Sequence, residues 1–183
     1  MILVNIWGGP CTGKSSTAYL ATAILKTCGV NCELVTEFAK DLVWQNRLSS
    51  LQNCSYVFGT QFERIRQLED KVDVVITDSP LELVLLYTPP DYPVEFREYV
   101  KKICSNQERL DFLMCKTLPF SAVGRTQNEA EAIELQSKVR GLMDELEIEY
   151  TKAVDPEKAA TLIIHKLRDK IKGDIDKSLH TLI

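Results

Sequence analysis

The feature that most constrains this fold is the run Gly8 to Ser15, which matches the pattern G-x-x-x-x-G-K-[ST] without a gap. The apolar run 2–7 precedes it and predicts a buried strand, and residues 15–28 follow with a helical pattern that ends at Gly29. Glycines let a loop between a strand and a helix curl until successive N–H groups point inward, which forms a nest for phosphate oxygens. The run therefore predicts a phosphate-binding loop.

Each residue type in this loop has an expected role. Lys14 places an ammonium group on the β- and γ-phosphates, and the Ser15 hydroxyl provides a magnesium ligand. Cys11 occupies a variable position of the motif, where its thiol would lie near bound phosphate and be sensitive to oxidation. The expected cofactors are therefore ATP and Mg²⁺. The residues expected to bind them are Gly8, Gly9, Pro10, Cys11, Thr12, Gly13, Lys14, Ser15 and Ser16.

The rest of the chain alternates strand and helix patterns. Further strands are expected at 33–36, 72–77, 110–115 and 148–154, and further helices at 37–47, 56–69, 81–87, 94–104, 129–146 and from Pro156 onward. Strands separated by helices pair in parallel through right-handed crossovers. We therefore expect one α/β domain over residues 1–183, with three layers around a five-stranded parallel sheet.

Two carboxylates follow predicted strands and are candidates for catalysis. Asp78 comes directly after the strand at 72–77, which should lie beside the first strand, so Asp78 can hold magnesium or accept a proton. The alternative is a cap for the helix that starts near Pro80. Glu37 ends the second strand and can act as a general base toward an attacking hydroxyl. Its alternative role is to stabilise the dipole of the following helix.

A long loop at about 117–128 follows the fourth predicted strand, and its length in so short a chain indicates a function. Gly124 provides a hinge, and Arg125 provides a permanent charge with bidentate donors. An arginine that closes over the γ-phosphate strongly accelerates phosphoryl transfer. We therefore predict a lid loop with Arg125 as a catalytic residue, the alternative being a solvated surface arginine. Asn128 is expected to cap the next helix.

Composition excludes several classes of protein. The chain has 22 Lys and Arg against 26 Asp and Glu, so its formal charge of −4 gives no overall basic field toward nucleic acid or anionic lipid. No apolar run is long enough for a membrane helix, and the first strand lacks the pattern of a signal peptide. The six cysteines form no C-x-x-C pair, so we expect free thiols and a cytoplasmic location.

The C-terminal helical tail at about 156–183 carries an apolar stripe at three- and four-residue spacing. Packing against the domain is the expected role, and a homodimer contact is the alternative. The stripe comprises Ile164, Leu167, Ile171, Ile175, Leu179 and Leu182.

Several segments carry a family resemblance, namely 8–15, 35–44, 58–61, 72–80, and 124–127 with Glu129. Through them the chain resembles P-loop kinases of the ribosylnicotinamide-kinase-like type and, more closely, a group of bacteriophage ATP-binding proteins. Some members of that group phosphorylate 5-hydroxymethyluracil in DNA. The resemblance implies a three-layer P-loop NTPase/kinase fold whose sheet has the order 2-3-1-4-5. It also implies transfer of the γ-phosphate of ATP to that hydroxymethyl group, in the cytoplasm of a host cell. The chain departs from the usual phage pattern at Cys11 and at 53–55.

The sequence is compatible with three functions. The first is a kinase for a modified base in DNA, the second is a kinase for a free nucleoside or nucleotide, and the third is a regulatory P-loop ATPase without an acceptor. Two or three aromatic residues near the second strand and the proline cluster are expected to face the ligand. The candidates are Trp44, Tyr56, Phe58, Phe62, Tyr87, Tyr92, Phe96 and Tyr99. The side chains that would meet DNA phosphates are Arg64, Arg66, Lys71, Arg97, Lys101 and Lys102, unless acidic neighbours neutralise them.

Overall fold

The sheet has five parallel strands in the order β2-β3-β1-β4-β5, as the sequence predicts. The computed structural model describes residues 1–115, 128–168 and 170–171. Its strands are β1 (Ile2–Trp7), β2 (Cys32–Val35), β3 (Val74–Thr77), β4 (Arg109–Met114) and β5 (Thr151–Ala153). In the register, Asn5 of β1 lies opposite Thr77 of β3 on one side and Asp111 of β4 on the other. The carboxyl ends of β1, β2 and β3 therefore meet at one edge of the sheet.

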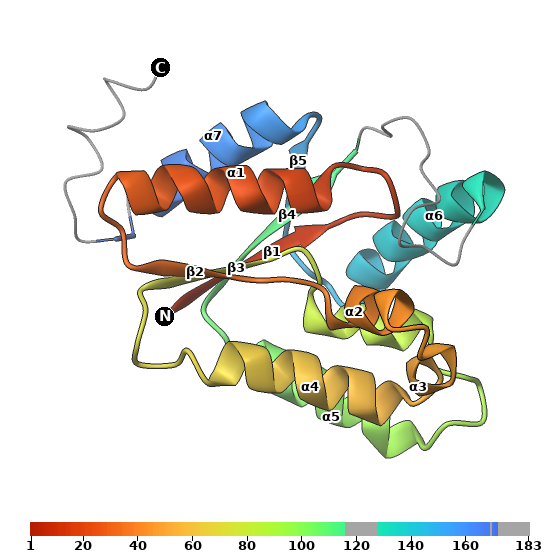
Figure 1. Cartoon of the computed structure of the whole chain (residues 1–183). Coiled ribbons are helices and arrows are strands. Elements are labelled where there is room, and N and C mark those ends of the chain that lie inside the picture. Colours follow the sequence, from red (N-terminus) through yellow and green to blue (C-terminus); the bar gives the residue numbers. More distant parts are fainter. Residues whose placement is uncertain (116–127, 169, 172–183) are drawn as a thin grey trace.

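Helices cover both faces of this sheet and complete three layers (Figure 1). Two of them, α1 and α7, lie together on one face, and the other helices cover the opposite face. The helices are α1 (Lys14–Thr27), α2 (Phe38–Trp44), α3 (Leu48–Leu51), α4 (Cys54–Arg66), η1 (Leu81–Leu86), α5 (Val94–Ser105), α6 (Glu129–Glu145) and α7 (Pro156–Arg168).

Successive side chains of β1 point to opposite faces of the sheet and pack into two separate hydrophobic clusters. Ile2, Val4 and Ile6 point to the cluster formed with α1 and α7. Leu3 and Trp7 point to the opposite cluster, formed with α4, η1, α5 and α6. All six residues of β1 are buried, as expected for a central parallel strand covered by helices on both faces. This rigid central strand carries the phosphate-loop sequence at its exit.

The structure corrects two predicted elements. The strand expected at 148–154 is limited to Thr151–Ala153, because residues 147 and 148 complete the end of α6. Glu147 takes a left-handed φ of 54°, and the Ile148 N–H donates to the Met143 carbonyl, a geometry that ends a helix. The helix expected at 81–87 is a 3-10 helix with hydrogen bonds between residues three apart, such as Leu83 N–H to the Pro80 carbonyl.

Other expectations are confirmed. Asn128 caps α6 through a capping box, because its side chain accepts from the Glu131 N–H while the Glu131 carboxylate accepts from the Asn128 N–H. All six cysteines are free thiols. Ile164 and Leu167 of the apolar stripe are buried against α1 and the sheet, whereas Ile175, Leu179 and Leu182 lie outside the described residues. None of the described helices is long and apolar enough to cross a membrane.

Candidate functional site

The loop after β1 has the backbone geometry that a phosphate nest requires. Gly8 has a φ of 148°, and a Cβ atom there would lie 2.5 Å from the Thr12 hydroxyl, so a larger residue cannot occupy this turn without displacing Thr12. Thr12 is buried and its hydroxyl donates to the Gly9 carbonyl at 2.9 Å. Cys11 adopts a left-handed φ of 60°, which explains why glycine suits this position. Gly13, with a φ of 92°, then leads into α1.

Lys14 and Ser15 begin α1 and face the same pocket. The Lys14 ammonium donates to the Gly9 carbonyl at 2.8 Å, and this hydrogen bond keeps the lysine side chain against the backbone of the loop. Ser16, also predicted to bind the cofactor, is exposed on the first turn of α1 and does not line this pocket. Lys14 and Ser15 are therefore the loop side chains best placed for phosphates and magnesium.

Asp78 joins the loop to two other segments. Its carboxylate accepts a hydrogen bond from the Ser15 hydroxyl and another from the Glu37 backbone N–H, at 3.2 Å. Asp78 is only 4% exposed, and both contacts are partly buried at the edge of the pocket. The alternative role as a cap for the helix near Pro80 is not seen, because η1 receives no side-chain cap.

Glu37 is the N-cap residue of α2, and its side chain makes no capping hydrogen bond there. Hydrogen bonds to two successive backbone N–H groups fix the position of Glu37. The Asp78 carboxylate holds the Glu37 N–H, and the buried Gln61 side chain accepts from the Phe38 N–H at 2.9 Å. Gln61 also donates to the Thr36 carbonyl at 3.3 Å. Glu37 therefore lines the pocket beside the phosphate loop from a well-anchored turn.

Sequence reasoning missed two glutamines that organise this site. Gln61 belonged to a family-like segment without an assigned role, although a buried glutamine on an apolar helix face signals a specific partner. Gln136 of α6 had no such signal. Its carbonyl oxygen accepts from the Gly9 N–H at 2.5 Å, and its NH₂ group donates to the Met114 carbonyl at 2.9 Å. Both glutamines anchor backbone groups that flank the pocket.

The pocket that contains these groups has a volume of about 370 Å³. Its phosphate end is formed by Lys14, Ser15 and Asp78, and its other end is largely apolar. The walls of that apolar end include Ala39, Val43, Leu51, Cys54, Val57, Phe58, Leu83, Val84, Leu135 and Val139. A pocket with one charged end and one apolar end suits a ligand that joins a polar group to a flat or apolar one.

Tyr87 contributes a polar group on the apolar side of this pocket. Although the residue as a whole is 53% exposed, partial burial of its hydroxyl and the nearby Glu37 carboxylate raise the pKa of Tyr87 to about 12. At neutral pH Tyr87 is therefore a neutral phenol that can donate one hydrogen bond and accept another. Of the eight aromatic candidates, Phe58 and Tyr87 line the pocket.

Four of the other aromatic candidates pack around Phe58 and one another, namely Phe62, Tyr92, Phe96 and Tyr99. Tyr56 packs against Phe38 instead, and Trp44 is exposed. Phe58 stacks with Phe62 at 5.9 Å between ring centroids and meets Phe96 and Tyr99 edge to face. The Tyr92 hydroxyl pairs with Ser55 at 2.6 Å. These contacts belong to the core between α4 and α5, which is the ordinary role of aromatics at helical spacing.

Most of the basic candidates for nucleic-acid binding already have acidic partners. Arg64 pairs with Asp41 at 2.7 Å and lies 4.9 Å from the centre of the Phe38 ring. The other ion pairs are Arg66 with Glu63, Arg97 with Glu145, and Lys101 with Glu98. Acidic neighbours thus neutralise much of this surface, which leaves a weak field for a polyanion.

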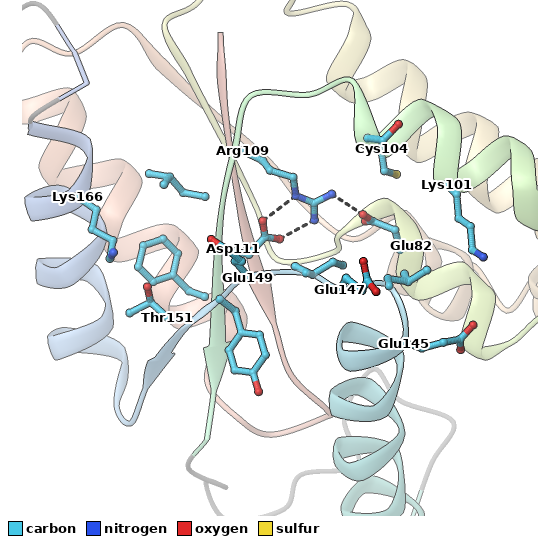
Figure 2. A pocket seen from close by; sticks show the side chains of 16 residues that line it. Glu82, Lys101, Cys104, Arg109, Asp111, Glu145, Glu147, Glu149, Thr151 and Lys166 are labelled. Atoms are coloured by element: carbon cyan, nitrogen blue, oxygen red, sulfur yellow. Dashed lines mark hydrogen bonds and ion pairs between the residues drawn. The ribbon is translucent and has the colours of Figure 1, made fainter.

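A second pocket, of about 720 Å³, lies near the start of β4, away from the phosphate loop (Figure 2). Its wall holds a buried charge network in which Arg109 contacts Glu82 and binds both carboxylate oxygens of Asp111, at 2.6 and 2.7 Å. The Trp7 indole N–H donates to Asp111 at 2.6 Å. Burial opposes the charge of Arg109, but the contacts with Asp111 and Glu82 outweigh it and raise the Arg109 pKa. Each charged group of this network has an oppositely charged partner within it, so the network has a structural role.

The donor set at the phosphate loop fits the cofactors expected from the motif. The ammonium of Lys14 suits phosphate, and the hydroxyl of Ser15 beside the carboxylate of Asp78 forms a pair of hard oxygen ligands of the kind that Mg²⁺ prefers. Within the described ranges, no three His, Cys, Asp or Glu side chains form a metal site of their own. Arg125 and the predicted lid lie outside the described residues.

Fold and site together define a P-loop nucleotide-binding protein with a kinase-type sheet order. The profile of an AAA domain family matches residues 3–157, and the chain belongs to that family. A search of curated proteins finds no match.

Solved structures with a similar fold include deoxyadenosine kinase from M. mycoides. With dATP bound, that kinase has a TM-score of 0.56 and 16% sequence identity to this chain. With dCMP and a flexible dCDP as products, the values are 0.54 and 13%. Both comparisons cover 91% of this chain and 99% of the kinase. At this level of identity, the likeness establishes the shared fold.

Proposed function

We propose that this protein is an ATP-dependent kinase that transfers the γ-phosphate to a hydroxyl group of a free nucleoside or nucleotide. One observation carries the proposal: a single pocket is lined both by Lys14 and Ser15 of the phosphate loop and by Glu37 from another strand end. A kinase needs space for an acceptor beside the phosphates, because the acceptor oxygen must lie in line with the γ-phosphate.

The proposed reaction assigns one task to each group. Glu37 takes the proton from the acceptor hydroxyl as the oxygen attacks the γ-phosphorus, and the bond between that phosphorus and the β–γ bridging oxygen breaks to release ADP. Lys14 neutralises charge on the transferred group. Ser15 and Asp78 would hold magnesium, which supplies further charge neutralisation at the phosphates. Arg125 remains the proposed lid residue.

The choice of a small acceptor rests on size, charge and fold likeness. About 370 Å³ is enough for one nucleoside beside the phosphate end, and Phe58 and Tyr87 provide aromatic surface for a base. The surface that would meet a DNA backbone is largely neutralised by ion pairs, including Arg64 with Asp41 and Arg97 with Glu145. The deoxyadenosine kinase of similar fold acts on the same class of molecule. The hydroxymethyl group of 5-hydroxymethyluracil in DNA is the competing acceptor.

The test is an acceptor panel with radiolabelled ATP and magnesium. The panel contains deoxynucleosides, deoxynucleoside monophosphates, duplex DNA with 5-hydroxymethyluracil, and unmodified duplex. We expect label on a small acceptor and about 10²- to 10⁴-fold slower transfer by Glu37→Gln, the range for loss of a general base. Glu134→Gln, on the exposed face of α6, is the matched control and should be fully active. Label on modified DNA alone would establish the DNA kinase, and release of phosphate without any labelled acceptor would indicate an ATPase.

A further inference from the structure

Gln136 connects three segments that are far apart in the sequence. It lies in the middle of α6, accepts the N–H of Gly9 in the phosphate loop, and donates to the carbonyl of Met114 at the end of β4. Both functional ends of one amide are therefore occupied by main-chain groups. An amide side chain with both ends bound holds a fixed orientation, unlike a surface glutamine that is free to rotate.

The loop and the helix also touch directly at Gly9. A Cβ atom on Gly9 would lie 3.0 Å from the Gln136 backbone nitrogen and 3.1 Å from the Ala132 carbonyl, so the bare glycine lets the loop rest on the backbone of α6. On its other side, the Gly9 carbonyl accepts from Thr12 at 2.9 Å and from Lys14 at 2.8 Å. The Gly9 residue is thus held at its N–H by α6 and at its carbonyl by the loop's own side chains.

We infer that Gln136 is a positioning residue for ATP, because it fixes Gly9 and thereby keeps the phosphate loop in its open, curled form before the nucleotide arrives. The inference rests on the proposed role of the loop in binding ATP. The Lys14 ammonium donates to the Gly9 carbonyl, and the contact with Gln136 sets the place of that carbonyl. A loop that is already ordered loses less conformational entropy on binding, so its ligand affinity is higher.

Gln136→Met tests the contact, because methionine has a similar length and no strong acceptor or donor. The probe is ATP with magnesium, titrated into the full chain by calorimetry. We expect Kd to rise about tenfold, in the range for a lost hydrogen bond that leaves a partly buried N–H without a partner. The KM for ATP should rise in parallel, whereas the KM for the acceptor found in the panel should stay unchanged. Glu134→Gln, two residues away on the exposed face, should leave both constants unchanged.

Gly9→Ala breaks the same contact from the side of the loop, and it provides a double-mutant cycle. Because the alanine side chain pushes the loop away from α6, adding Gln136→Met to Gly9→Ala should change the ATP Kd by less than twofold. Additive effects would contradict the inference. So would an unchanged Kd in Gln136→Met, or a parallel rise in the KM values for ATP and acceptor, which would indicate a general structural role. Failure of the unmodified protein to bind ATP would instead contradict the proposed function itself.

Discussion

The Ser15 hydroxyl donates a hydrogen bond to the Asp78 carboxylate, and this contact joins positions 63 residues apart in the chain. It forms because β1 and β3 are parallel neighbours that end at the same edge of the sheet, one carrying the phosphate loop and the other the acid. The second carboxylate oxygen of Asp78 then fixes the backbone of Glu37. One buried side chain thus links the proposed magnesium ligand to the proposed base.

Asp78→Asn separates the charge of this residue from its shape. The amide oxygen of asparagine still accepts one hydrogen bond, so the fold and the Glu37 turn should persist, while the negative charge that favours magnesium is lost. We expect the magnesium concentration for half-maximal transfer to rise by roughly 10- to 100-fold, the range for interactions of charged groups. The measurement is transfer rate against magnesium concentration at saturating ATP. An unchanged magnesium dependence would show that Asp78 is not a metal partner.

The contact of Lys26 with Glu33, by comparison, lies on the exposed surface far from the pocket. Glu33→Gln removes a similar charge without touching the site. It should leave the magnesium dependence unchanged, which makes it the control for general charge effects.

Arg109→Met should strongly destabilise the fold without directly changing the proposed site. The variant leaves Glu82 and Asp111 buried and negatively charged without their shared cation, because these two side chains are 4% and 3% exposed. We expect the free energy of unfolding to fall by about 3–5 kcal/mol in urea denaturation. Arg66→Met removes an exposed ion pair with Glu63 and should leave the free energy of unfolding nearly unchanged. Equal losses in the two variants would contradict a structural role for the buried network.

Cys11→Gly should stabilise the chain. A non-glycine residue at a φ of 60° carries a steric cost of roughly 1–2 kcal/mol, part of which is offset by the greater flexibility of glycine in the unfolded chain. We therefore expect a gain of about 0.5–1 kcal/mol in the free energy of unfolding. Cys28→Gly is the matched control, because Cys28 has an ordinary φ of −79° and its replacement should bring no gain. A loss of stability in Cys11→Gly would show that the thiol contacts outweigh the backbone strain.

Tyr87 should titrate later than an ordinary tyrosine. Its pKa in the fold is about 12 against 10 in the unfolded chain, so the folded state keeps a proton that the unfolded state releases. Any stability that this phenol contributes is therefore complete below pH 10 and is lost as the pH rises toward 12. Ultraviolet titration of tyrosinate should show a late signal, and Tyr87→Phe should remove it. Loss of a signal near pH 10 in Tyr87→Phe instead would contradict the raised pKa.

Local patterns were enough to predict the architecture. The loop Gly8 to Ser15 predicts a strand–loop–helix unit, and the remaining apolar runs predict five parallel strands. The order of these strands is what a P-loop kinase fold implies, and the structure confirms it. The Asn128 cap and the start of α7 at Pro156 were also predicted, since both depend on residues within one helical turn.

Contacts between distant segments were not predictable in the same way. The bond from Gly9 to Gln136 spans 127 residues, and a polar residue on an amphipathic helix gives no sign of its partner. The fifth strand was predicted at 148–154, but β5 covers only Thr151–Ala153, because the turn at Glu147 that ends α6 has no clear sign in the local sequence pattern. The Gly9–Gln136 contact and the boundary of β5 depend on how distant segments pack, which the residue type at one position does not reveal.

The central claim is that the loop after β1 binds the triphosphate of ATP through Lys14. The most direct measurement is a calorimetric titration of the unmodified chain and of Lys14→Met with ATP and magnesium. The account predicts one ATP site in the unmodified chain and roughly 10- to 100-fold weaker binding in the variant, the range for loss of a charged contact. No ATP binding by the unmodified chain, or equal affinity in both proteins, would contradict it.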